Sequence, residues 1–233
     1  MQTTRLDLVP GTLCDERMWS RLTPLLGAGF DLNYVPLYQA QDRPQMQQVL
    51  AEHSAAPANI VAFSLGVYIA LEYALAYPER VKSMVLIAGS AKGLSAKEKE
   101  LRLRTIPLLE RTVYAGLSGV RLREVLHPIH HDDRATIDLI QQMALDLGKN
   151  VLLTQFRASM DRPDVMERLH EITCPVLLVG ANEDKLVDPG ILPEMHPRFP
   201  NARLRMYDNT GHMIPLEVPE LLAADLVNFY GSQ

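Results

Sequence analysis

The chain has 233 residues, of which 47% are hydrophobic and 22% charged, and its formal net charge is −5 at pH 7. These values are typical of one globular domain with a full hydrophobic core, and they exclude the basic surface of a nucleic-acid-binding protein. The chain has no apolar run long enough to span a membrane, no signal-peptide pattern at its N-terminus and only two cysteines. We therefore expect a cytoplasmic protein with reduced thiols that binds neither nucleic acid nor membrane.

Short apolar runs, typical of β-strands, alternate with amphipathic segments, typical of helices. The predicted strands cover residues 6–9, 31–35, 59–63, 83–89, 175–180 and 202–207. The helices predicted between and after them cover residues 15–26, 44–56, 65–77, 189–199 and 217–230. Several strands are apolar on both faces, as strands of a helix-covered parallel sheet must be. This alternation predicts an α/β fold with right-handed crossovers.

Residues 92–168 interrupt the alternation, because only helical patterns are found there. We expect one helix over residues 95–117 and another over residues 133–160. Ser95 and Glu98 have the spacing of a capping box at the start of the first helix. We interpret this region as a helical lid, inserted into an α/β core that consists of residues 1–91 and 169–233.

The segment HPIHHDD, residues 127–133, gathers three histidines and two aspartates between the two lid helices. Its spacing matches none of the metal-binding signatures that have a known ligand geometry. Polar residues are expected in a loop between surface helices, so we predict no metal site there.

The segment IVAFSLGVYI places Ser64 between an apolar strand and an apolar helix. Ligands bind beyond the carboxyl ends of the strands in an open parallel sheet, and Ser64 follows such an end. A serine on a sharp strand-to-helix turn exposes its hydroxyl group beside backbone N–H groups that can stabilise an oxyanion. The turn requires small neighbours, and Ala62 and Gly66 are small. A structural turn serine is the alternative, because short glycine and serine patterns arise by chance.

A serine hydroxyl becomes an effective nucleophile when a base removes its proton and a carboxylate orients that base. His212 follows the strand at 202–207, and Asp184 follows the strand at 175–180. Both loops leave the sheet at the edge where Ser64 lies, so these residues are candidates for a catalytic triad. Asp188 is the main rival acid, and Glu183 and Asp208 are weaker rivals.

The turn after the first strand, PGT, can supply a second donor to an oxyanion. We predict the N–H groups of Thr12 and Leu65 as the two donors, with Leu13 as the alternative to Thr12. Cys14 lies beside this turn but has no strand-to-helix turn of its own, so we expect it to pack in the core. Phe63 and Met213, each adjacent to a candidate catalytic residue, are the predicted substrate contacts.

Four blocks in this order resemble the α/β-hydrolase family, in its small single-domain branch of esterases, lactonases, C–C hydrolases and haloperoxidase-like enzymes. AFSLG resembles the turn that carries the nucleophile, and YPERVKSMVLIAGSA resembles the helix end and strand that follow it. CPVLLVGANEDKLVDP resembles the loop of the acid, which favours Asp184, and NTGHMIPLEVPE resembles the loop of the histidine. The resemblance covers nearly the whole chain and implies the fold and the triad, but not the substrate.

Two departures from the family pattern affect the prediction. The chain has Pro10-Gly11 where the family often has His-Gly, which changes hydrogen bonding around the oxyanion turn. The chain also reaches the strand that carries this turn by Leu6, whereas the family usually begins with a two-stranded hairpin. We therefore expect a reduced, mostly parallel sheet of about six strands flanked by helices, with one edge less covered than usual. Such an edge allows a homodimer.

These observations predict a serine hydrolase that cleaves a small carboxylic ester, lactone or thioester through an acyl-enzyme intermediate. Ser64 is the predicted nucleophile, His212 the base and Asp184 the acid, and no metal or organic cofactor is required. The alternatives are a C–C hydrolase, a lyase or an acyltransferase that uses the same triad, and a non-catalytic ligand-binding module on the same scaffold.

Overall fold

The structure is a computed structural model that describes residues 3–231; the outermost residues of the predicted core, 1–2 and 232–233, lie outside the described residues. Six parallel strands form one sheet in the order β2-β1-β3-β4-β5-β6. The strands are β1 (Thr4–Val9), β2 (Phe30–Tyr34), β3 (Ala58–Phe63), β4 (Val81–Ile87), β5 (Val176–Ala181) and β6 (Ala202–Tyr207). The predicted α/β sheet of six strands is confirmed, and each predicted strand overlaps an observed one.

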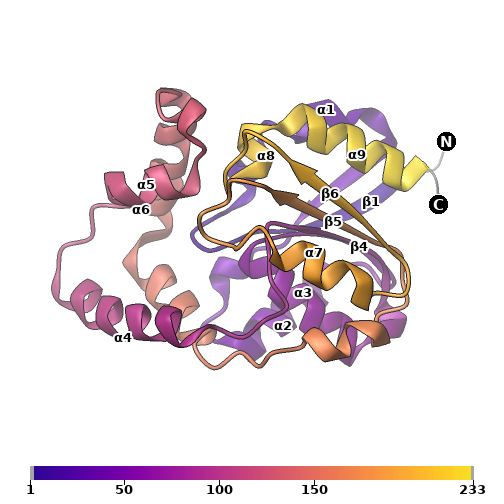
Figure 1. Ribbon diagram of the computed structural model, residues 1–233, viewed down its shortest axis with the longest axis horizontal. Helices are drawn as coiled ribbons and strands as arrows, with labels where there is room; N and C mark the ends of the chain where they lie inside the picture. The colour runs from indigo at the N-terminus through magenta and orange to yellow at the C-terminus, as the bar shows by residue number, and fades with distance from the viewer. Residues whose placement is uncertain (1–2, 232–233) are drawn as a thin grey trace.

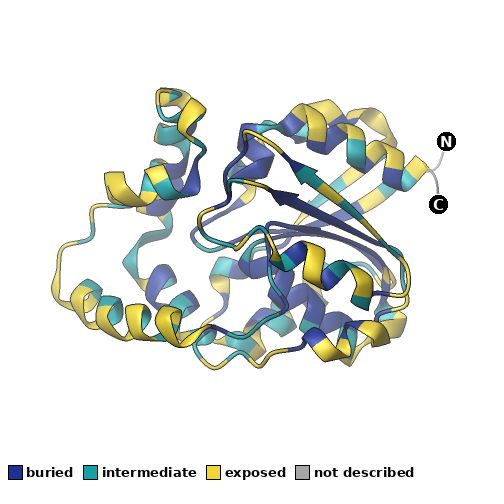
Figure 2. Ribbon diagram, in the orientation of Figure 1, coloured by how far each residue is buried: buried dark blue, intermediate teal, exposed yellow. Residues whose placement is uncertain are grey.

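Helices cover both faces of the sheet (Figure 1). On one face lie α1 (Thr23–Leu26), α8 (Ile214–Glu217) and α9 (Pro219–Gly231), and on the other α2 (Arg43–His53), α3 (Leu65–Ala76) and α7 (Ile191–Met195). Side chains of β3 alternate between the two apolar cores, with Ile60 and Ala62 on the α3 side and Val61 and Phe63 on the α9 side. Figure 2 shows that the inner strands of the sheet are buried between helices whose outer surfaces are exposed, whereas the edge strand β6 is partly exposed.

Short 3₁₀ helices extend or replace several predicted helices. They cover Glu16–Trp19, Gly27–Gly29, Leu37–Gln39, Pro78–Arg80, Pro128–His130, Met166–Glu171 and His196–Arg198. The predicted helix at 15–26 is therefore divided, and α1 restarts with Pro24 in its first turn. Pro219 likewise begins α9 and separates it from α8. Proline has no N–H group and fits the first turn of a helix far better than its interior, which explains both interruptions.

Three helices, α4 (Ala96–Arg111), α5 (Gly119–Val125) and α6 (Arg134–Ala158), lie within residues 92–168, the segment predicted to be a lid and called the lid below. Figure 1 shows them on the side to which the arrowheads of β5 and β6 point, beyond the carboxyl ends of the strands. The capping box of α4 is present, because Glu98 N–H donates to Ser95 Oγ at 3.2 Å and Ser95 N–H donates to Glu98 Oε2 at 2.8 Å.

The lid has one more helix than the sequence predicts. The helix predicted at 95–117 ends at Arg111, because the next residue, Thr112, has an extended backbone with φ −105° and ψ 155°. Gly116, in the loop that follows, has a left-handed φ of 79°. Ser118 then begins α5 as its N-cap, accepting the N–H of Arg121 at 3.2 Å. The helix predicted at 133–160 corresponds to α6, which has a kink at Gly148, where φ is 77°.

The strand order reverses between β1 and β3. The chain passes from β1 to β2 on one side, and then crosses to β3 on the other. Ligand sites of open parallel sheets lie at such a switch point, beyond the carboxyl ends of the two strands. Here those ends lead to Thr12 after β1 and to Ser64 after β3. Within the described residues no helix is both long and apolar enough to cross a bilayer.

Candidate active site

Ser64 occupies the sharp turn between β3 and α3. Its φ of 52° and ψ of −111° are rare for a residue with a side chain, and its N–H donates to Ile87 O of β4 at 2.9 Å. A Cβ atom on Gly66 would lie 2.7 Å from the carbonyl oxygens of both Val9 and Pro10, so only glycine fits there. This close packing holds the strained turn and leaves the Ser64 hydroxyl beyond the end of the sheet.

Three of the predicted side chains meet at this edge. Ser64 Oγ lies 2.9 Å from His212 Nε2, and His212 Nδ1 lies 2.7 Å from Asp184 Oδ2. Asp184 Oδ1 accepts the N–H groups of Leu186 at 2.7 Å and Val187 at 3.1 Å, which fixes the orientation of the carboxylate. Because a carboxylate only accepts, it favours the imidazole tautomer with its proton on Nδ1, and Nε2 is then free to accept from the serine.

The rival acids lie elsewhere in the neighbouring loops. Within the described residues, no hydrogen bond or ion pair links Asp188, Glu183 or Asp208 to His212. Their carboxylates accept hydrogen bonds from other groups: Asp188 from Gly190 N, Glu183 from Thr210 N and Asp208 from Asn182 Nδ2. Asp184 is thus the acid that the fold brings to His212.

The turn after β1 lies against Ser64. A Cβ atom on Gly11 would be 3.1 Å from Ser64 Cβ. In the part of the chain that the structure describes, the Thr12 N–H has no hydrogen-bond acceptor. The Leu13 N–H, by contrast, donates to Gln155 Oε1 of the lid at 2.9 Å. Leu65 is the first residue of α3, and helix geometry gives its N–H no acceptor inside the helix. Thr12 and Leu65 are therefore better placed than Leu13 to donate to a ligand.

Phe63 and Met213 are both deeply buried on the α9 side of the sheet. The ring of Phe63 lies 5.0 Å from the imidazole of His212, measured between centroids, so Phe63 supports the base directly. Their predicted contact with substrate stays a prediction.

Sequence reasoning missed Glu217, a buried carboxylate that holds the histidine loop. It accepts the N–H groups of His127 at 2.7 Å, Gly211 at 3.0 Å and Met213 at 2.9 Å, and two of these residues flank His212. Burial raises the pKa of Glu217, and the three N–H donors act in the opposite direction. A charged residue inside the apolar run MIPLEVP was the available signal.

Glu217→Gln is expected to lower the free energy of unfolding by about 1–3 kcal/mol, because an amide has one acceptor oxygen where three N–H groups need acceptors. The loosened histidine loop should also lower kcat by about 3- to 10-fold. Chemical denaturation and steady-state kinetics measure the two effects. Glu220→Gln, at an exposed position of α9, is the control and should change neither. Equal behaviour of the two variants would contradict this role for Glu217.

The lid contacts the same loop. The N–H groups of His212 and Met213 both donate to Val125 O, at 3.0 and 3.2 Å, where α5 ends. A Cβ atom on Gly211 would lie 2.5 Å from His127 N, so this approach requires glycine. The lid is therefore packed directly on the loop that carries the candidate base.

The HPIHHDD segment has structural contacts of its own. His131 Nε2 lies 3.1 Å from Leu126 O, and Asp133 caps α6 by accepting from Thr136 N at 3.1 Å and pairs with Arg21 at 3.0 Å. Within residues 3–231, no three or more histidine, cysteine, aspartate or glutamate side chains are grouped so that they could hold a metal ion.

Both cysteine thiols are expected to be unreactive in the folded protein. Burial raises the pKa of Cys14 to about 12 and that of Cys174 to about 11. At pH 8 the thiolate fraction is then about one in a thousand or less, and the thiolate is the reactive form. Iodoacetamide should therefore leave activity unchanged and add no mass to the native protein, whereas the denatured protein should gain two adducts. Inactivation of the native protein with a label on Cys14 would overturn this expectation.

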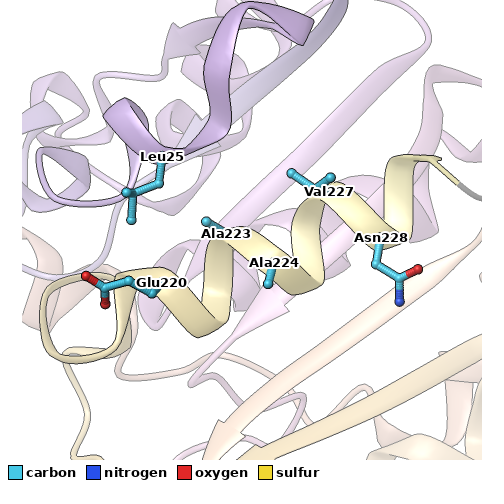
Figure 3. A pocket seen from close by; sticks show the side chains of 6 residues that line it. All are labelled: Leu25, Glu220, Ala223, Ala224, Val227 and Asn228. Atoms are coloured by element: carbon cyan, nitrogen blue, oxygen red, sulfur yellow. The ribbon is translucent and has the colours of Figure 1, made fainter.

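An apolar hollow of about 490 Å³ lies between α1 and α9, away from this arrangement. Figure 3 shows the side chains that line it: Leu25, Glu220, Ala223, Ala224, Val227 and Asn228. None of the predicted site residues lines the hollow.

Known proteins similar to this chain agree with the fold. A family model described as serine aminopeptidase, S33, matches residues 40–219. The 2-hydroxy-6-oxononadienedioate/2-hydroxy-6-oxononatrienedioate hydrolase of Paraburkholderia phymatum is 28% identical over 181 residues, 75% of this chain and 62% of that protein. The chain thus spans less than two thirds of that relative's length.

Two further proteins match over nearly the whole chain. The pimeloyl-[acyl-carrier protein] methyl ester esterase of Neisseria meningitidis is 28% identical over 232 residues, 93% of this chain and 89% of that protein. The structure of a thermophilic esterase from Thermogutta terrifontis has a TM-score of 0.85 at 20% identity, and covers 99% of this chain and 90% of its own. The chain belongs to the family described as serine aminopeptidase, S33, within the α/β-hydrolase superfamily.

Proposed function

We propose that the protein is a serine hydrolase that cleaves a small carboxylic ester, lactone or thioester through an acyl-enzyme intermediate. The observation that carries this proposal is the continuous row of hydrogen bonds from Ser64 Oγ to His212, at 2.9 Å, and from His212 to Asp184, at 2.7 Å. Such a row supplies a base that can take the serine proton and an acid that stabilises the protonated base.

In the proposed acylation, the serine, the histidine and the two N–H groups each have one role. Ser64 Oγ attacks the carbonyl carbon, the π electron pair moves to the carbonyl oxygen, and His212 Nε2 takes the hydroxyl proton. The N–H groups of Thr12 and Leu65 hold the resulting oxyanion. When the carbonyl reforms, the bond to the leaving oxygen or sulfur breaks, and His212 gives its proton to the leaving group. Asp184 stays ionised and stabilises the imidazolium.

Deacylation repeats these steps with water. His212 removes a proton from a water molecule as the water oxygen attacks the acyl carbon, and the same two N–H groups hold the second oxyanion. Collapse of this intermediate breaks the bond to Ser64 Oγ, and the proton on His212 returns to the serine. Every proton is carried by Ser64, His212 or water, so the proposed cycle uses no metal or organic cofactor.

Ester cleavage is the first candidate reaction because the relative from N. meningitidis, named as a methyl ester esterase, matches across most of both chains. Cleavage of a C–C bond is the second, because the relative from P. phymatum is named as a hydrolase of an oxo-dioate. In that reaction, or in a lyase or acyl-transfer reaction, His212 would act mainly as a base and the N–H groups of Thr12 and Leu65 would hold the oxyanion. Hydrolase relatives argue against the non-catalytic ligand-binding module.

Intact mass after treatment with a fluorophosphonate probe tests the proposal. The wild type should gain one adduct, mapped to Ser64, because the probe phosphonylates a serine that has an effective base. Ser64→Ala should gain none. An unlabelled wild type with folded structure would overturn the proposal.

A panel of short esters, lactones and thioesters then separates the candidate reactions. An acyl mass on Ser64 after rapid acid quench supports ester or thioester cleavage. Turnover of a vinylogous oxo acid with no acyl adduct supports C–C cleavage.

A further inference from the structure

A glutamine of the lid contacts the oxyanion turn. Gln155 lies in α6, is 1% exposed, and its Oε1 accepts the N–H of Leu13 at 2.9 Å. Leu13 directly follows Thr12, the proposed oxyanion donor. This bond joins residues that are 142 positions apart in the sequence, and it places a lid side chain against the residue that follows the proposed oxyanion donor.

Leu13 is held in an uncommon backbone conformation. Its φ is 53°, in the left-handed region that residues with a branched side chain rarely adopt. Such strain persists only where the surroundings hold it. The Leu13 side chain packs with Ala144 and Leu152, which lie on either side of the α6 kink, and the Gln155 amide accepts its N–H. Two restraints on Leu13 therefore come from the lid, in addition to the bond from Cys14 N–H to Gly11 O, at 3.3 Å, which closes the turn from within.

Packing alone does not account for a glutamine at this position. The Leu13 N–H can only donate, so Gln155 must present its oxygen, and its Nε2 is left buried without a hydrogen-bond partner within the described residues. An unpaired buried donor destabilises a protein; an apolar side chain of similar size would remove this one but would leave the Leu13 N–H without its acceptor. The bond to Leu13 is the contact that only the polar side chain provides.

Gln155 is itself fixed by the rest of the lid. The main-chain carbonyl oxygen of Gln155 accepts a hydrogen bond from Ser159 Oγ at 2.7 Å. Ser159 Oγ in turn accepts one from the guanidinium of Arg102 in α4. The guanidinium also lies over the ring of Phe156, 5.0 Å from its centroid. A row of contacts thus runs from α4 through α6 to the oxyanion turn.

We propose that Gln155 is a positioning residue: its Oε1 holds Leu13 in the left-handed conformation that keeps the Thr12 N–H aligned with the oxyanion. The lid thereby completes the oxyanion site as well as covering it. This inference rests on the proposed serine-hydrolase function, and it concerns stabilisation of the oxyanion and not binding of the ground-state substrate.

Gln155→Met tests this role, because methionine matches the length of glutamine but cannot accept the Leu13 N–H. The matched control is Gln141→Met: Gln141 lies on the same helix, and its Oε1 accepts the N–H of Leu117 at 2.9 Å within the lid. With p-nitrophenyl butyrate, Gln155→Met should lower kcat by about 10- to 100-fold with KM within about threefold. Gln141→Met should keep kcat within about twofold, although it loses two hydrogen bonds within the lid, one from Leu117 N and one to Ala115 O.

The inhibition constant of a trifluoromethyl ketone should not change when the lid is loosened in general. Ser64 adds to its carbonyl carbon and the oxygen becomes an oxyanion, so the inhibition constant reports the oxyanion site. Gln155→Met should weaken this inhibitor by the same factor as kcat/KM, and Gln141→Met should not. Equal losses in the two variants, or an unchanged inhibition constant in Gln155→Met, would overturn the inference.

Gln155→Glu is the second variant if the methionine variant does not fold. A carboxylate can still accept the Leu13 N–H, but its charge opposes the oxyanion, so kcat at pH 8 should fall by at least about tenfold. Wild-type kcat in this variant would contradict the placement of residue 155 beside the oxyanion. The fluorophosphonate adduct on the wild type separates the two hypotheses: without it the proposed function fails, whereas with it only the role of Gln155 is in question.

Discussion

Ser64→Ala is expected to lower kcat for p-nitrophenyl butyrate by about 10⁴- to 10⁶-fold, with the thermal midpoint unchanged. The hydroxyl is the only part of the side chain that alanine removes, and in the proposed mechanism its proton passes to His212 Nε2, 2.9 Å away. The oxyanion donors remain, which accounts for a residual rate above that in water. Initial rates over a range of substrate concentrations measure the effect.

Ser90→Ala is the matched control for this variant. Ser90 also lies beyond the carboxyl end of a central strand, β4, but its hydroxyl accepts the N–H of Lys92 at 3.0 Å and, within the described residues, makes no hydrogen bond to His212. Its removal should leave kcat within about twofold. A Ser64→Ala preparation that keeps a tenth of wild-type activity, with no adduct from the fluorophosphonate probe, would exclude Ser64 as the nucleophile.

The sheet could be predicted from the sequence because its strands are short, several of them are apolar on both faces, and helix-sized segments separate them. The same alternation places Ser64, Asp184 and His212 at one edge, since the carboxyl ends of parallel strands share that edge. Local signals such as the Ser95 capping box were equally readable. Helix interruptions at Pro24 and Pro219 were not predicted, although proline in the first turn of a new helix explains them.

The lid supplies what the sequence could not show. Val125 holds the histidine loop through two N–H groups, and Gln155 holds the oxyanion turn, yet both lie far in sequence from the loops that they contact. Periodicity shows which face of a helix is apolar but not which distant loop it meets. In the sequence, Gln155 is one polar residue beside an apolar helix face. Its role is recognised only from its contact with Leu13, which the structure shows. The lid is thus part of the frame that aligns the site.

Asp184→Asn is expected to lower kcat by about 10⁴-fold, the effect known for the corresponding change in a serine-protease triad. Asp184 Oδ1 accepts the N–H groups of Leu186 and Val187, so the oxygen of an asparagine should stay at that position. The amide NH₂ group would then face His212 Nδ1 as a donor. The imidazole would have to accept there and carry its proton on Nε2, where it could no longer take the proton of Ser64.

Asp188→Asn separates this tautomer effect from a general loss of charge in the acid loop. Its Oδ1 accepts the N–H of Gly190 at 2.8 Å, and an asparagine oxygen can do the same, so kcat should stay within about twofold. Both variants lose one negative charge within four positions of each other, so a purely electrostatic effect of the loop would lower both rates together. A large loss in Asp188→Asn with a small one in Asp184→Asn would move the acid to Asp188. We expect the opposite: a large loss in Asp184→Asn and a small one in Asp188→Asn. That result would mean that the contact of 2.7 Å between Asp184 and His212 keeps the imidazole proton on Nδ1.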